Sequence, residues 1–171
     1  MFNRQSSNGD TMCMATTVKL SWHDGIRFSA TLQNRIIELD SAEKMESAFT
    51  PMELFLVALV GCTSMDVQWI LQQQRQKVTK LEINTRGTRR DEDPRYYDLI
   101  ELEYTVTGDE IRKDAVERAI RLSQAKYCSV RAMLNEKVRL DIKYKIINQD
   151  GTEQEYTYDD SASEVQRQLT G

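Results

Sequence analysis

One long apolar segment limits what this chain can fold into more than any other feature. The segment runs from Leu54 to Leu71 and follows a clear helix-start pattern. Thr50 can cap the helix, Pro51 suits its first position, and Glu53, three residues after the cap, completes a capping box. Because the segment is apolar on nearly all sides, we expect a helix that is buried in a core rather than one lying on it.

Size and charge narrow the class of protein. A chain of 171 residues is most simply one domain. Its formal net charge of -4 gives no reason to expect a nucleic-acid partner. By our reading no apolar run approaches the roughly 20 residues that a membrane span needs, so no membrane partner is expected. The N-terminus lacks the apolar core of a signal peptide, which predicts a cytoplasmic protein.

Alternating apolar and polar residues predict strands on both sides of the helix. The predicted strands cover residues 16–22, 26–32, 35–39, 80–88, 99–106 and 138–146. The first three would form an antiparallel meander with one buried face, with a hairpin turn at His23-Asp24-Gly25. A second helix is predicted from Glu110 to Lys126 and, after a break at Tyr127-Cys128, a short third helix that Ser129 caps.

This order of elements predicts an α+β fold with a mainly antiparallel sheet and a long buried central helix. A helix of such length is hard to enclose in one small domain. That difficulty favours a dimer in which two such helices cover each other.

Two of the three cysteines lie in helical segments. Cys62 is about three turns into the apolar helix, where the helix dipole no longer acts. An apolar setting leaves a thiol inert unless a cation or hydrogen-bond donors come from elsewhere. Cys128 lies at the break between two helices, where loop backbone and a helix N-terminus can face a thiolate. From these residues alone a reactive and a plain structural interpretation stay open for each, and Cys13 is taken as incidental.

Other residues give weaker signals for chemistry. His23 is the single histidine and is interpreted as a turn residue, and the chain has no C-x-x-C, so a zinc site lacks its usual ligands. Asp66 is a carboxylate within the apolar helix. Because buried charges need partners, Asp66 is expected to face a polar cleft or to pair with an arginine.

Two segments carry a specific resemblance. They are TPMELFLVALVGCTSMDV at Thr50 to Val67 and LSQAKYCSV at Leu122 to Val130. Both resemble the OsmC/Ohr family of thiol-dependent hydroperoxide reductases, as do TRRDEDPR and EYTVTGDEI between them, which resemble its YhfA-like branch. The resemblance predicts an OsmC-like domain over residues 14–147. The residues outside it are interpreted as a polar arm over 1–13 and an acidic tail over 148–171 without a clear core face.

The resemblance implies an intertwined homodimer with two active sites at the interface, each using both cysteines of one chain. Cys62 would be the peroxidatic thiolate that attacks an organic hydroperoxide, and Cys128 the resolving thiol that then forms a disulfide with it. An external dithiol such as a dihydrolipoyl group would restore the pair, in a protein of oxidative-stress defence. No metal or organic cofactor is implied.

The sequence departs from the family pattern at two supporting residues. In the best-characterised members a glutamate directly follows the proline that opens the helix, and here that place is Met52. Glu53 is the neighbouring candidate. Those members also use an arginine from the early strands, for which Arg27 is the nearest candidate, with Arg35 behind it. These departures keep an alternative open: a non-catalytic binding protein of the same fold that holds an apolar ligand at the dimer interface.

Overall fold

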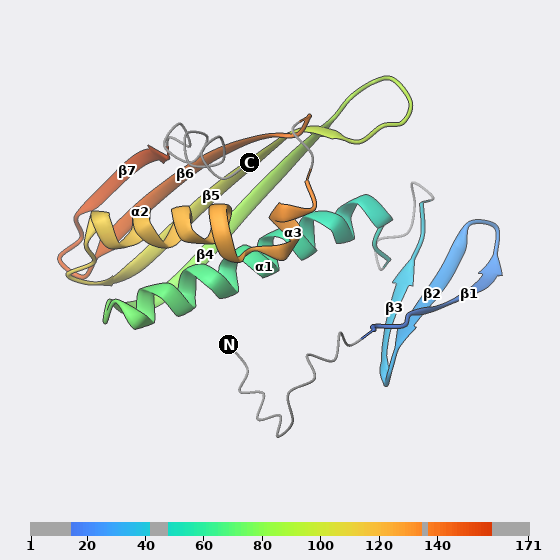
Figure 1. Ribbon diagram of the computed structural model, residues 1–171, viewed down its shortest axis with the longest axis horizontal. Coiled ribbons are helices and arrows are strands. Elements are labelled where there is room, and N and C mark those ends of the chain that lie inside the picture. The colour runs from blue at the N-terminus through green and yellow to red at the C-terminus, as the bar shows by residue number, and fades with distance from the viewer. Residues whose placement is uncertain (1–14, 42–47, 135–136, 159–171) are drawn as a thin grey trace. The chain divides into compact units, whose positions relative to one another are not determined.

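The computed structural model describes residues 15–41, 48–134 and 137–158 (Figure 1). The chain divides into two compact units, Met1–Pro51 and Met52–Gly171. The predicted N-terminal arm, with Cys13, lies outside the described residues, as does the end of the predicted tail from residue 159 onward. The predicted domain boundaries after residues 13 and 147 stay predictions.

The first unit is a three-stranded antiparallel meander, as predicted. Its strands are β1 (Lys19–Asp24), β2 (Arg27–Leu32) and β3 (Arg35–Leu39), in the order β1-β2-β3. Gly25 adopts a φ of 49° in the turn between β1 and β2, a conformation that glycine tolerates best. The predicted buried face is wrong for this chain, because Leu20 is 56% and Trp22 65% exposed. The described residues of this unit, 15–41 and 48–51, form no helix of their own against which this face could pack.

The second unit is a helix-covered sheet. It contains α1 (Pro51–Gln73) and a sheet of β4 (Lys77–Arg89), β5 (Tyr97–Asp109), β6 (Arg139–Asn148) and β7 (Glu153–Tyr158), in the order β4-β5-β6-β7. Among the four described strands of this sheet, β5 and β6 form the parallel pair, and the other neighbours pair antiparallel. A parallel pair requires a crossover connection. Here the crossover consists of α2 (Lys113–Leu122), the π-helical turn η1 (Ser123–Tyr127) and α3 (Ser129–Ala132).

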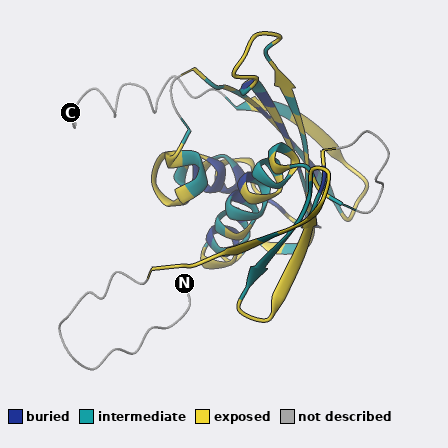
Figure 2. Ribbon diagram, turned by 90° about the vertical axis from the view of Figure 1, so that its right-hand side faces the viewer, coloured by how far each residue is buried: buried dark blue, intermediate teal, exposed yellow. Residues whose placement is uncertain are grey.

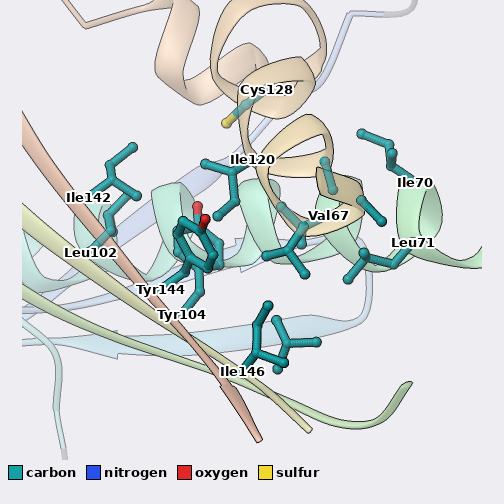
Figure 3. Close-up of a cluster of buried hydrophobic side chains, with 14 of the residues drawn as sticks. Val67, Ile70, Leu71, Leu102, Tyr104, Ile120, Cys128, Ile142, Tyr144 and Ile146 are labelled. Atoms are coloured by element: carbon teal, nitrogen blue, oxygen red, sulfur yellow. The ribbon is translucent and has the colours of Figure 1, made fainter. Parts of the chain in front are cut away.

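The core lies between the sheet and the helices α1 and α2 (Figure 3). Along β5, buried side chains alternate with more exposed ones, the period expected of a strand with one covered face. Tyr104 on β5 and Tyr144 on β6 are the largest fully buried side chains. Leu59, Val67 and Leu71 pack against this cluster from α1. The apolar helix is therefore the central element of the fold, as predicted.

The burial of α1 is one-sided rather than complete (Figure 2). Its buried residues are Leu59, Thr63, Val67, Ile70 and Leu71. On the other side, Val57 is 54% and Met65 74% exposed. The expectation of a helix buried all round is thus wrong within one chain, since a single sheet covers a single helix face.

By length and composition, α1 could also cross a membrane. The expectation that no segment is long and apolar enough to span a membrane is therefore wrong by length and composition. The reason is that small and weakly polar residues such as Gly61 and Thr63 barely lower the mean hydropathy of the helix. A core helix of a soluble protein passes the same test, and the inner face of α1 packs against the hydrophobic core.

Two further predictions are corrected by the structure. The second helix, predicted to run on to Lys126, ends at Leu122, where the backbone widens into η1. The sequence predicts a tail without a core face, yet β7 pairs with β6 and Tyr156 stacks on Tyr144 with ring centroids 5.0 Å apart. Polar residues fill most of β7, so its two inward tyrosines give only a weak alternating pattern.

A pair of glycine substitutions tests this packing. A Cβ atom added at Gly108 would lie 2.3 Å from the Lys77 carbonyl oxygen and 2.7 Å from Ile111 Cδ1, whereas one added at Gly61 meets nothing within 4 Å. We expect Gly108→Ala to lower the free energy of unfolding by about 1–3 kcal/mol through overpacking. Gly61→Ala meets no atom of its own chain and should change the free energy of unfolding less than Gly108→Ala does, with helix propensity contributing up to about 1 kcal/mol in its favour. Urea unfolding followed by circular dichroism measures both, and equal midpoints for Gly108→Ala and wild type would contradict the described packing.

Candidate active site

The fold brings Cys62 and Cys128 together, although they lie far apart in the sequence. Their Sγ atoms and a carboxylate oxygen of Asp66 all lie within 4.8 Å of one another. Both cysteines are free; Cys128 is buried and Cys62 is partly exposed. A disulfide needs the two sulfurs about 2.05 Å apart. The pair is therefore near enough to react after a local side-chain movement.

Helix α1 presents two of these groups on one face. Cys62 and Asp66 are four residues apart, and such residues are neighbours on a helix surface. The residue after Cys62, Thr63, is fully buried and turns toward the core. Cys62 and Asp66 thus lie beside the buried stripe of α1, at the boundary of the core.

The π-helical turn places Cys128. Its backbone N–H donates to the Ser123 carbonyl oxygen at 2.9 Å, five residues earlier, which is the hydrogen bond of a π turn. The chain then becomes extended at Cys128, which confirms the predicted break there. The Arg131 N–H donates to Cys128 Sγ at 3.3 Å, so Cys128 caps α3. The prediction of Ser129 as the cap is wrong, because helical geometry already begins at Ser129.

Burial dominates the acid–base behaviour of Cys128. Burial raises the pKa of its thiol to about 12, while the hydrogen bond from the Arg131 N–H acts in the lowering direction. The neighbouring Cys62 adds to the rise. Cys128 is consequently a neutral thiol near neutral pH.

Asp66 has a polar partner rather than an arginine in the described structure. The Ser123 hydroxyl donates to Asp66 Oδ2 at 3.1 Å. Burial raises the pKa of the Asp66 carboxyl, and the Ser123 hydrogen bond partly offsets that rise. Of the two predicted environments, the structure therefore supports the polar one.

A buried set of hydroxyls and one amide lies beneath the two cysteines. Thr63 Oγ1 lies 2.7 Å from Tyr104 Oη and 2.9 Å from Ser123 Oγ, and it accepts a hydrogen bond from Gln124 Nε2 at 3.1 Å. Burial raises the pKa of Tyr104, which keeps its hydroxyl neutral. We call Thr63, Tyr104, Ser123 and Gln124 the hydroxyl network. It ties α1 and β5 to η1, and thereby holds Cys128 against α1.

Sequence reasoning did not single out the hydroxyl network. A usable signal exists in Thr63, a polar residue on the buried stripe of an otherwise apolar helix. A second signal is the pair Ser123-Gln124 at the end of the amphipathic α2, where both residues are buried.

The two predicted supporting residues lie in different units of the chain. Glu53 is exposed in the first turn of α1, and Cys62 follows nine residues later, about 13 Å along the helix axis. Arg27 belongs to the first unit, where its guanidinium pairs with Asp24 at 2.7 Å. Support of Cys62 by Glu53 or Arg27 stays a prediction.

A sheet packed against a long helix, with two cysteines from different elements close together beside that helix, is the arrangement by which this class of protein is recognised. Residues 43–143 match the family described as OsmC-like protein, and the chain belongs to this family. The resemblance seen in the sequence is confirmed, as is the α+β fold with mainly antiparallel sheets and a long central helix.

Particular relatives place the chain within the family. Protein YhfA of Escherichia coli (strain K12) is 37% identical over 132 residues, which cover 75% of this chain and 96% of that protein. The crystal structure of a hypothetical protein from Aquifex aeolicus VF5 is 31% identical with a TM-score of 0.72, covering 80% of this chain and 98% of that one. The structure of an organic hydroperoxide resistance protein OsmC from Legionella pneumophila shares the fold at 12% identity, with a TM-score of 0.61 and coverage of 80% and 98%.

The environment of Cys128 predicts an unusual pH dependence of its alkylation. The Cys13→Ser/Cys62→Ser double variant leaves Cys128 as the single cysteine. Because burial raises the pKa of Cys128 to about 12, its reaction with iodoacetamide should accelerate about tenfold per pH unit from pH ~7 to ~10 without levelling off. Glutathione, whose free thiol levels off above about pH 8.5, serves as the control. A plateau for Cys128 below pH ~9 would contradict the described burial.

Proposed function

We propose that this protein is a thiol-dependent peroxidase that reduces organic hydroperoxides to alcohols, with Cys62 as nucleophile and Cys128 as resolving thiol. The observation that carries the proposal is the approach of the two sulfurs to within 4.8 Å. Membership of a family that includes a protein described as an organic hydroperoxide resistance protein supports it.

The different exposure of the two thiols supports their roles. Cys62 is partly exposed on α1, whereas Cys128 is only 3% exposed, so a peroxide reaches Cys62 first. The Cys62 thiolate attacks one peroxide oxygen; an S–O bond forms as the O–O bond breaks. The departing alkoxide takes up a proton and leaves as the alcohol. Cys62 is oxidised by two electrons to a sulfenic acid.

Cys128 then resolves the sulfenic acid. Its sulfur attacks Cys62 Sγ; the S–S bond forms as the S–O bond breaks, and the hydroxide leaves as water with the proton of the Cys128 thiol. Asp66, whose carboxylate oxygen lies within 4.8 Å of both sulfurs, is placed to pass that proton on. The Arg131 N–H stabilises the negative charge that develops on Cys128 Sγ. An external dithiol, such as a dihydrolipoyl group, then reduces the disulfide and is itself oxidised.

The surface beside Cys62 favours an apolar substrate. Ala58 and Met65 lie one turn before and after Cys62 on α1, and both are exposed. An alkyl group gains from contact with such side chains, whereas hydrogen peroxide has no apolar part to bury. The proposed substrates are therefore alkyl or lipid hydroperoxides.

The exposed side of α1 also supports a homodimer. Val57 and Met65 are large apolar residues left uncovered within one chain. A second copy that packs its own α1 on this side would cover them, as the family resemblance implies. The cytoplasmic location, where dithiol reductants are maintained, belongs to the same proposal.

Peroxide consumption by variants that each lack one cysteine tests the proposal. With cumene hydroperoxide and dihydrolipoamide, wild type and the matched control Cys13→Ser should turn over at similar rates. Cys62→Ser should fall to the uncatalysed rate, because it lacks the nucleophile. Without added dithiol, Cys128→Ser should consume one equivalent rapidly and accumulate a sulfenic acid that dimedone traps.

Equal rates for wild type and Cys62→Ser would contradict the peroxidase proposal. If both thiols also stayed reduced after peroxide treatment, the alternative of a non-catalytic binding protein would be favoured.

A further inference from the structure

Three potential metal ligands converge at the cysteine pair. They are Cys62 Sγ, Cys128 Sγ and a carboxylate oxygen of Asp66, all within 4.8 Å of one another. Asp66 and Cys62 are partly buried and Cys128 is buried. Thiolate and carboxylate are both established zinc ligands, and three protein ligands with an open fourth position form a common zinc arrangement.

We propose that the reduced protein binds one Zn²⁺ per chain through Cys62, Cys128 and Asp66, with water in the fourth position. This function is separate from peroxide reduction and does not require it. The sequence pattern gave no such prediction, because the chain has one histidine and no C-x-x-C. The ligands instead come from two elements, α1 and the break between η1 and α3, that only the fold brings together.

The spacing fits zinc after a small adjustment. With Zn–S bonds of about 2.3 Å and Zn–O bonds of about 2.0–2.2 Å, tetrahedral ligand atoms lie roughly 3.4–3.8 Å apart. The observed upper limit of 4.8 Å therefore leaves about an ångström to close. Cys62 and Asp66 project from neighbouring turns of one helix face, so side-chain rotation supplies this movement without a change of backbone.

Neighbouring groups already orient two of the three ligands. Ser123 donates to Asp66 Oδ2 at 3.1 Å, and the Arg131 N–H donates to Cys128 Sγ at 3.3 Å. Such outer hydrogen bonds fix ligand direction in metal sites, and their loss typically lowers metal affinity about 10–100-fold. Ser123 is itself held by Thr63 at 2.9 Å. The site is thus supported from the buried side.

The donor set selects the class of metal. Two thiolates favour Zn²⁺ and other thiophilic ions over Mg²⁺ and Ca²⁺, which prefer sets of oxygen ligands. Since zinc would occupy the sulfurs that react with peroxide, zinc binding and peroxide reduction would compete for the same two thiolates.

Cobalt substitution tests the site directly. Co²⁺ added to the reduced, metal-free protein under anaerobic conditions should give thiolate-to-cobalt charge-transfer bands and the intense visible bands of tetrahedral Co²⁺. Stoichiometric Zn²⁺ should abolish these bands, and excess Mg²⁺ should leave them unchanged. Cys62→Ser and Cys128→Ser should each weaken the charge-transfer bands, and the double variant should lose them. Competition with a colorimetric chelator should show zinc affinity at least ~10-fold weaker in Asp66→Asn, and about 10-fold weaker in Ser123→Ala.

Matched controls separate this site from other thiols and carboxylates. Cys13→Ser and Asp98→Asn, a substitution of an exposed residue on β5, should bind zinc as wild type does. Circular dichroism shows whether each variant is folded. Absence of the charge-transfer bands in wild type, their survival without both Cys62 and Cys128, or their loss in Cys13→Ser would overturn the proposal. Zinc binding is measured without peroxide, so its failure and a failure of peroxide reduction are distinguishable.

Discussion

The hydroxyl of Thr63 is the contact on which the geometry of the cysteine pair depends. It lies on the buried stripe of α1 and meets Tyr104 from β5 and Ser123 from η1. Hydrogen bonds in a buried network are strong, and a buried hydroxyl left without a partner is costly, so the three elements are held in one arrangement. That arrangement sets Cys128 against α1, where Cys62 stands next to Thr63 in the chain.

The same network gives the two thiols and the carboxylate different surroundings. Cys128 is enclosed and keeps its proton, because burial raises its pKa to about 12. Cys62 is open to solvent on one side. Asp66 shares its Ser123 partner with the network, which links the carboxylate to the buried side of the site. The site therefore combines an accessible thiol, an enclosed thiol and a carboxylate near both. This combination suits two successive reactions at sulfur, or the binding of one thiophilic metal ion.

Much of the fold could be predicted because its elements have strong local patterns. Thr50, Pro51 and Glu53 indicate the start of α1, and apolar and polar residues alternate clearly along the inner strands. Other features depend on contacts that no local pattern reveals. The π turn begins at Ser123, whose side chain is hydrogen-bonded to Thr63 and Asp66, contacts that no local pattern indicates. Strand β7 is recognised only once Tyr156 is seen stacked on Tyr144. The cysteine pairing came from family resemblance, since local chemistry left both thiols ambiguous, whereas Asp66 joined the site only through the fold.

The central claim is that each chain carries its own reactive cysteine pair, and the disulfide formed on oxidation tests it most directly. Light and ¹⁵N-labelled chains are mixed, unfolded, refolded together and treated with one equivalent of cumene hydroperoxide, and non-reduced peptides are analysed by mass spectrometry. The account predicts a Cys62–Cys128 disulfide that joins light to light and heavy to heavy peptides only. Mixed light–heavy pairs, or a disulfide to Cys13 in place of this one, would contradict it.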